Sequence, residues 1–219
     1  MKAGRWDISD LVKDPSSEEF SRFLRSIEEQ VVKFERGRQL LRPNISPEEF
    51  EDLIHTLESI SEKVSIASGH AYLSYYADTS SNEASALVIK MEKLASEISN
   101  RMLFFDLWFK KHIDDENANR LINSIPKAYQ EHLRHKRLVA KYSLSEPEEK
   151  IINTLEVTGS RALIKIYDKM TSGFEFTMKL RHGRKTIEKK FDNKEKLVSL
   201  VRSPDGNKRE AAYKSLLQV

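Results

Sequence analysis

The chain contains no cysteine, which excludes disulfides, thiolate metal ligands and a cysteine nucleophile. Glycine and proline are scarce, at 7 and 6 of 219 residues, and this scarcity favours long helices. No stretch approaches the roughly 18 apolar residues that a membrane-spanning helix needs. Residues 1–10 also lack the apolar run of a signal peptide. We therefore expect a cytoplasmic protein without a membrane partner.

Acidic and basic residues are nearly balanced, with 34 against 37 and a formal net charge of +3. So small a surplus does not indicate a dedicated nucleic-acid-binding protein. Charged residues make up 32% of the chain and aromatic residues 9%, which is typical of a globular rather than a disordered protein. This length suffices for one substantial hydrophobic core. Because no repeat or linker interrupts the sequence, we expect a single helical domain over residues 1–219.

Helix start signals and helical spacing dominate the first half of the chain. Two residue pairs fit the capping box of a helix N-terminus: Ser16 with Glu19, and Ser46 with Glu49. After the second pair, apolar residues recur at intervals of three and four on both sides of a turn at residues 78–82. They are Phe50, Leu53, Leu57, Ile60, Val64, Ala67 and Ala71, then Leu87, Met91, Leu94, Ile98, Met102, Phe105 and Trp108. We predict an antiparallel hairpin of two long helices over about residues 46–112, with a coiled-coil-like seam.

Further helices are predicted over about residues 115–170. The last of them begins at Ser145, which fits a capping box with Glu148, and its apolar pattern continues to about Met170. Gly159 lies inside this pattern, where glycine costs about 1 kcal/mol relative to alanine. We interpret it as a point of close backbone contact.

The pattern then changes from helical spacing to alternation. Residues 174–191 predict a small β-hairpin, and a helix follows at residues 194–201. Residues 207–219 begin another amphipathic helix that reaches Val219 without a stop signal, which we interpret as truncation. The predicted fold class is mainly α, an antiparallel bundle of long helices with one small β-hairpin near the C-terminal end.

Four stretches of sequence carry a family resemblance, in order along the chain. They are Trp6–Leu11, Leu103–Trp108, the segment Leu144–Leu163 (Leu-Ser-Glu-x-Glu-Glu-Lys-Ile-Ile-Asn, then Thr-Gly, then Ala-Leu), and Ser203–Asp205 followed by Arg209–Tyr213. Together they resemble the N-terminal region of oligoendopeptidase F, a zinc metallopeptidase family related to thimet oligopeptidase. The resemblance spans nearly the whole chain, and its specificity comes from the set rather than from any one stretch.

The catalytic signature of that family is missing from this chain. The family binds zinc with a helical His-Glu-x-x-His and a downstream glutamate. The histidines here are His55, His70, His112, His132, His135 and His182, and none begins that motif. We therefore assign no catalytic or metal-binding residue, and the substrate-binding residues stay unassigned. No phosphate-cradling glycine loop or Gly-x-Ser-x-Gly motif suggests another chemistry.

The resemblance implies a role that needs no catalytic residue here. In the parent metallopeptidase this region would form one wall of a deep channel for short peptide substrates. The missing C-terminal catalytic domain would be its partner and would supply zinc and the catalytic glutamate. Alone, the chain is then an inactive N-terminal domain of a hydrolase. The alternative is a self-contained, non-catalytic helical interaction module derived from the peptidase family.

Two residue pairs that include histidine have a spacing that could suit a metal ion. His132 and His135 lie three residues apart on a predicted helix, but the basic residues around them oppose a cation. We interpret them as part of a solvated basic face. Asp52 and His55 also share a helix face, yet a di-iron bundle needs Glu-x-x-His pairs on two helices and the chain has none. We interpret this second pair as exposed and structural.

Aromatic residues at helical spacing can either pack in the core or line a ligand groove. The group Phe104, Phe105, Trp108 and Phe109 is predicted to lie in the core rather than in a ligand groove. A second group consists of Tyr72, Tyr75 and Tyr76. Tyrosine combines packing with a polar contact, and in a peptidase these residues can also face the substrate channel.

The hairpin is strongly basic. Its cationic residues are Lys179, Arg181, Arg184, Lys185, Lys189 and Lys190, beside Phe174 and Phe176. Such a set suits contact with a phosphate backbone. Lysine on an edge strand also guards against strand-to-strand aggregation, which is the interpretation we favour, so nucleic acid is not an expected partner.

Overall fold

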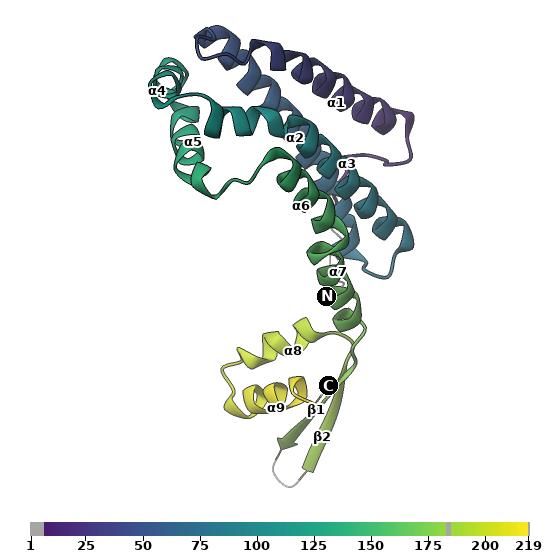
Figure 1. Cartoon of the computed structure of the whole chain (residues 1–219). Helices are drawn as coiled ribbons and strands as arrows, with labels where there is room; N and C mark the ends of the chain where they lie inside the picture. Colours follow the sequence, from purple (N-terminus) through teal and green to yellow (C-terminus); the bar gives the residue numbers. More distant parts are fainter. Residues whose placement is uncertain (1–6, 183–184, 219) are drawn as a thin grey trace. The chain divides into compact units, whose positions relative to one another are not determined.

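The computed structural model describes residues 7–182 and 185–218. The chain divides into two compact units, Met1–Thr158 and Gly159–Val219. Figure 1 shows the elements of both. The single domain predicted over residues 1–219 stays a prediction. Within the described residues, no helix combines the length and apolar character needed to cross a membrane.

Three long helices build the first unit. They are α1 (Glu18–Arg36), α2 (Pro47–Ala77) and α3 (Asn82–Leu107). α2 and α3 form the predicted antiparallel hairpin, and α1 packs against both. The cap of α1 is Ser17, whose hydroxyl accepts a hydrogen bond from the backbone N–H of Phe20, so the predicted capping role of Ser16 is wrong by one residue. Ser16 instead bonds to Asp14.

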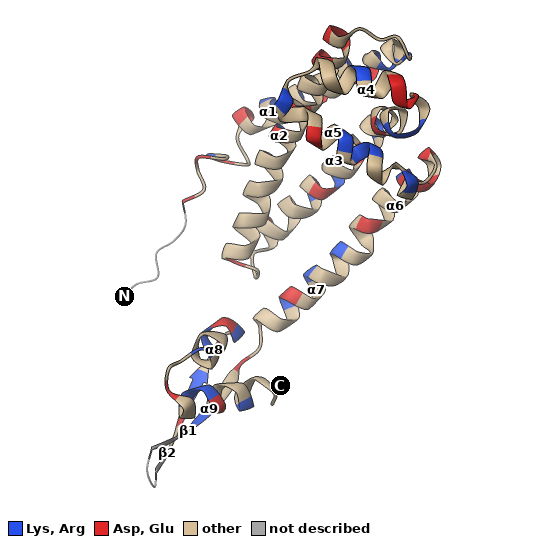
Figure 2. Cartoon of the chain, turned by 90° about the vertical axis from the view of Figure 1, so that its left-hand side faces the viewer, with Lys and Arg blue, Asp and Glu red and all other residues tan. Residues whose placement is uncertain are grey.

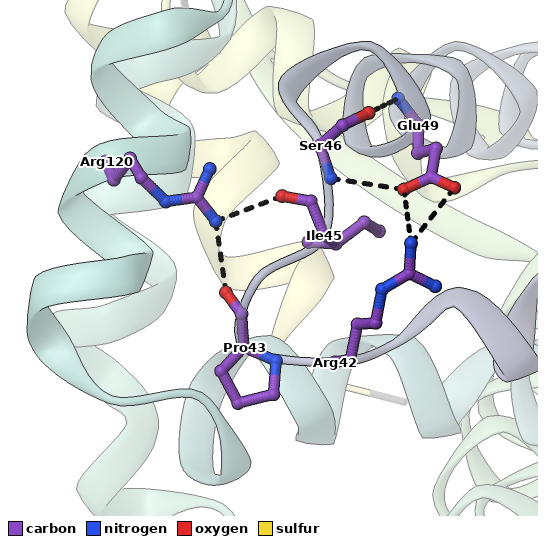
Figure 3. Close-up of polar contacts among 6 residues, drawn as sticks. All are labelled: Arg42, Pro43, Ile45, Ser46, Glu49 and Arg120. Atoms are coloured by element: carbon purple, nitrogen blue, oxygen red, sulfur yellow. Dashed lines mark hydrogen bonds and ion pairs between the residues drawn. The ribbon is translucent and has the colours of Figure 1, made fainter.

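The capping box at the start of α2 forms as predicted. The Ser46 hydroxyl accepts from the Glu49 N–H at 3.1 Å, and the Glu49 carboxylate accepts from the Ser46 N–H at 3.1 Å. Figure 3 shows that Arg42 also pairs with Glu49, at 3.2 Å, and that Arg120 donates to the carbonyls of Pro43 and Ile45 at 3.0 Å each. The loop before α2 is therefore fixed at both ends, and Arg120 fastens it to a later helix.

Shorter helices complete the first unit. α3 continues into a π-helical turn (Trp108–His112), a deviation that inserts one extra residue per turn. It is followed by α4 (Asp115–Ser124), α5 (Lys127–Leu138), a 3₁₀ turn (Val139–Tyr142) and α6 (Glu146–Thr158). Asp114 caps α4 by accepting from the N–H of Asn117 at 2.8 Å.

An aromatic cluster forms the centre of the first unit. Phe50 is fully buried. The centroid of its ring lies 6.0 Å from the ring centroid of Phe105, 6.4 Å from that of Trp108 and 5.6 Å from that of Phe109. Phe104 is buried in the same core. The prediction that the group from Phe104 to Phe109 is core rather than a ligand groove is therefore confirmed.

The helix predicted from Ser145 to about Met170 is interrupted. α6 ends at Thr158 and α7 (Ser160–Ser172) begins after Gly159, whose φ of −94° and ψ of −107° leave the helical region. The predicted continuous helix is therefore wrong at this position. The glycine that costs helical stability marks the break and the division between the two units.

The second unit contains α7, a β-hairpin and two further helices. β1 (Phe176–His182) pairs antiparallel with β2 (Lys185–Phe191), in a register that sets Phe176 opposite Phe191. α8 (Lys194–Val201) and α9 (Gly206–Leu216) follow. A small core of its own joins Phe176, Met178, Phe191, Leu197 and Ala212. The predicted fold class, mainly helical with one small hairpin near the C-terminal end, is confirmed.

Truncating the central aromatic ring tests the first unit. We expect Phe50→Ala to lower the free energy of unfolding by about 3–5 kcal/mol, because it leaves a cavity among three rings. Urea unfolding followed by circular dichroism measures the loss. Leu138→Ala is the control: Leu138 is 70% exposed, and the expected change is within about 0.5 kcal/mol. Equal losses for both variants would contradict this core.

Candidate functional site

The described residues contain no group of three or more histidine, aspartate or glutamate side chains placed to hold a metal ion. His132 and His135 are both exposed on α5, on the basic face that the sequence indicated. His70 is buried in α2, and its Nδ1 has no hydrogen-bond partner among the described residues. The residues present therefore do not fit the zinc site that the family resemblance implies for the catalytic part.

A pocket of about 400 Å³ lies where α2, α3 and α5 meet. Apolar side chains supply much of its lining: Ile54, Leu57, Phe105 and Leu133. Glu58, Tyr129, His132 and Lys136 add polar groups. Such a mixture suits a ligand that presents an apolar side chain together with polar backbone groups.

Tyr129 organises the polar side of this pocket. Its hydroxyl donates to Glu58 Oε2 at 2.6 Å and lies 3.4 Å from His55 Nδ1. The hydrogen bond to Glu58, which is the largest contribution, raises the pKa of Tyr129 above its usual value. His55 is paired with Glu51 at 3.4 Å and with Glu58 at 3.7 Å. Asp52 and His55 are both exposed, as the sequence predicted.

On the other side of the pocket, the half-buried carboxylate of Asp106 holds the lining residue Lys136 in place. Asp106 accepts from Lys136 at 2.6 Å and pairs with Lys110 at 2.5 Å. Burial would raise the pKa of Asp106, but the two ammonium groups outweigh it and hold that pKa below its ordinary value. Desolvation, followed by the charge of Lys136, lowers the pKa of His132. His132 is therefore held in its neutral form to a lower pH than a histidine without these neighbours.

α6 turns its polar side toward its own unit. It packs on α3 through hydrogen bonds: Ser96 Oγ donates to the Asn153 carbonyl at 3.0 Å, and Asn153 Nδ2 donates to Asn100 Oδ1 at 2.9 Å. Its apolar residues face outward, with Ile151, Ile152 and Leu155 exposed by 58%, 49% and 61%. We call these three residues the α6 apolar face. This arrangement is the reverse of an ordinary surface helix.

α7 has a similar surface within the second unit. None of its residues is buried, and its exposed large apolar residues are Leu163, Ile164, Ile166, Tyr167 and Met170. Leu163, Ile166, Tyr167 and Met170 follow one another at helical spacing, so they share one side of the helix. We call these four residues the α7 apolar face. The sequence pattern identified an amphipathic stripe here but not that it would be exposed.

The tyrosine group divides between packing and exposure. Tyr75 is buried, whereas Tyr76 is 60% exposed. The Tyr72 hydroxyl donates to Glu92 Oε1 at 2.5 Å, and its ring stacks on Tyr76 at 6.2 Å. Tyr72 thus combines packing with a polar contact, as expected. The alternative role, a contact with the substrate channel of a peptidase, stays a prediction.

The basic residues of the hairpin belong to a wider charge division. Residues 159–219 hold 15 lysines and arginines against 7 acidic residues, whereas residues 1–158 hold 22 against 27. Figure 2 shows lysine and arginine on β1, β2, α8 and α9. Of the predicted basic set, Lys179, Lys189 and Lys190 are exposed. Arg184 lies outside the described residues, as do the side chains of Arg181 and Lys185.

Comparison with known proteins supports the family resemblance. Residues 111–176 match the model of a family described as Oligopeptidase F. The crystal structure of oligoendopeptidase-F from Enterococcus faecium matches 93% of this chain with a TM-score of 0.67 and 17% sequence identity. This chain covers 40% of that one. No curated protein matches. The resemblance to the N-terminal region of this family is confirmed, and the structural match shows the fold.

The pKa of His132 provides a test of the pocket. The unfolded chain takes up the His132 proton at a higher pH than the folded chain does, because folding lowers this pKa. The free energy of unfolding therefore falls as the pH drops from the ordinary pKa of histidine to the lowered pKa of His132. We expect Lys136→Gln to raise the His132 pKa, since a neighbouring positive charge is removed. An NMR titration of the ring protons measures it, with Lys141→Gln as the control. An unchanged or lower pKa in Lys136→Gln would contradict the described geometry.

Proposed function

We propose that this chain forms the N-terminal, non-catalytic part of a zinc-dependent oligoendopeptidase of the Oligopeptidase F family. In this role it supplies one wall of a channel that admits short peptides. The family match over residues 111–176 and the shared fold support the assignment. The chain covers 40% of the matched structure, so the activity of a whole enzyme is part of the proposal.

The outward-facing apolar residues of α6 carry this proposal. Ile151, Ile152 and Leu155 stand together on one side of a helix whose polar side is satisfied by α3. Contiguous exposed apolar surface marks a contact with another protein surface. We infer that the catalytic part packs there. The α7 apolar face, in the second unit, offers a further surface of the same chemistry.

Zinc has no place among the residues of this chain. The family binds the metal through His-Glu-x-x-His and a further glutamate, and none of the six histidines begins that motif. We therefore assign zinc and the catalytic glutamate to the catalytic part, and we assign no chemical step to this chain. Its contribution is to bound the channel and to exclude folded proteins from it. A cytoplasmic location belongs to the same proposal.

The alternative is a self-contained helical interaction module derived from the peptidase family. It is favoured by one observation: each unit has its own buried core, with Phe50 at the centre of the first and Leu197 in the second. Under this alternative the α6 apolar face would bind a different protein, and no peptide would be hydrolysed by any larger assembly.

The coding sequence distinguishes the two functions. We expect an open reading frame beyond the codon for Val219 that encodes His-Glu-x-x-His. We expect the purified 219-residue chain to bind no stoichiometric zinc and to cleave no peptide, because the ligands are missing. A stop codon directly after Val219 would favour the interaction module. Zinc-dependent cleavage of a quenched fluorescent peptide by the purified chain would sink both.

The α6 apolar face can be tested on the isolated chain. We expect the double variant Ile151→Lys and Leu155→Lys to bind less of a hydrophobic dye and to self-associate less. The free energy of unfolding should change by no more than about 0.5 kcal/mol, because both side chains are exposed. Dye fluorescence and light scattering measure the effect.

A lone exposed isoleucine is the matched control. Ile89 on α3 is 56% exposed, and Ile89→Lys should leave dye binding and self-association nearly unchanged. If this variant reduced both as strongly as the double variant, the α6 apolar face would have no special role.

A further inference from the structure

The hairpin of the second unit has one covered edge and one open edge. α9 lies along β1, where Ser215 Oγ donates to the Thr177 carbonyl at 3.0 Å. Among the described residues, β2 pairs with no strand other than β1. Residues 186–190 of β2 are all exposed, and Ile187 is 53% exposed. In Figure 1, β2 lies on the side of the pair away from α9.

The register shows which backbone groups of β2 point outward. Because the Thr177 carbonyl bonds to Ser215, it points away from β2. Thr177 and its partner Lys190 therefore form a non-hydrogen-bonded pair of the ladder. Such pairs recur every second residue, so Lys179 and Glu188 form the next one. The N–H and carbonyl of Lys190 and Glu188 consequently point to the open edge.

The unit that carries this edge is basic. The second unit has a surplus of 8 basic residues, and Lys189 and Lys190 are exposed on β2 itself. A hollow of about 600 Å³ lies beside β2, lined by Lys189, Lys190 and Lys196, by the acidic Glu175 and Asp192, and by the apolar Phe191 and Leu200. Lys189 covers the Phe191 ring at 5.2 Å. The hollow thus offers ammonium groups next to apolar surface.

We propose that the open edge of β2 binds an extended peptide segment with acidic side chains. The peptide adds a strand through the outward groups of Glu188 and Lys190, and its carboxylates meet Lys189 and Lys190. Lysine on an edge repels a second copy of the same basic strand. The same lysines attract a strand of opposite charge, so the residues that prevent self-association also favour an acidic partner.

A peptide fits this edge better than nucleic acid does. Another extended backbone matches both the outward N–H groups and the outward carbonyls, whereas phosphate oxygens accept hydrogen bonds but donate none. Several lysines are already paired with carboxylates, including Lys179 with Glu188 at 3.3 Å and Lys196 with Asp192 at 2.5 Å. These pairs reduce the field that a phosphate backbone would need.

This inference rests on the proposed function only in the ligand class, a short peptide. It concerns binding to this chain and needs no cleavage. Binding is measured on the purified chain without zinc, so its failure leaves the peptidase proposal standing. A missing catalytic reading frame would likewise leave the binding result standing.

Fluorescence polarisation tests the edge with a labelled hexapeptide of alternating glutamate and valine. We expect it to bind the full chain at low salt, and the lysine–valine counterpart to bind at least about tenfold more weakly. A glutamate–valine peptide with alternate backbone nitrogens methylated should also lose binding, because it cannot complete the ladder. This comparison uses the unaltered chain and so does not depend on any variant folding.

Paired variants locate the site. Glu188→Pro removes an N–H that points away from β1, so it should abolish binding while the hairpin stays intact. Glu188→Ala removes the same carboxylate but keeps that N–H, and should bind at least as tightly as the unaltered chain. Lys189→Glu with Lys190→Glu should weaken binding by about tenfold. Lys208→Glu is the control for charge, since it changes an exposed residue of α9.

Three results would overturn the proposal. The first is equal binding of the methylated and unmethylated peptides. The second is tighter binding of a single-stranded oligonucleotide of equal charge, which would indicate a nucleic-acid surface. The third is a dimer that Glu188→Pro disperses while the peptide fails to bind, which would assign the edge to a second copy of the chain.

Discussion

The packing of Phe50 against the rings of Phe105, Trp108 and Phe109 is the interaction on which the first unit depends. Phe50 lies in the first turn of α2, next to the capping box that fixes where that helix starts. Its three partners lie at the end of α3 and in the π-helical turn. One ring therefore joins the two ends of the long hairpin. A local signal, the cap, sets the position at which a non-local contact can form.

This agreement between local and non-local forces explains why the long hairpin could be predicted from the sequence. Ser46 with Glu49 and the apolar spacing after them point to the same helix, and the structure places both as expected. The start of α1 shows the limit of such signals. Ser16 and Ser17 are chemically equivalent neighbours, but Ser16 bonds to the Asp14 carboxylate while Ser17 caps the helix, and the sequence does not distinguish the two.

The α6 apolar face could not be predicted, for a physical reason. Helical spacing tells which residues share a side of a helix, but not which neighbour covers that side. Ile151 and Leu155 read as an ordinary apolar stripe until α3 is seen to meet α6 through Ser96, Asn100 and Asn153. The break at Gly159 was hidden in the same way. Its cost in a helix is small enough that either a continuous or an interrupted helix was compatible with the sequence.

The net charge of +3 does not show the charge division within the chain, because an acidic surplus in one part cancels most of a basic surplus in the other. Electrostatic attraction acts over roughly 10 Å at moderate salt, so a ligand responds to nearby charges and not to the total. Lys189 and Lys190 belong to the basic part and stand beside outward backbone groups of β2. Charge alone would leave a phosphate backbone and an acidic peptide equally suitable. The direction of those backbone groups is what separates the two, because a ladder of hydrogen bonds demands an extended chain as its partner.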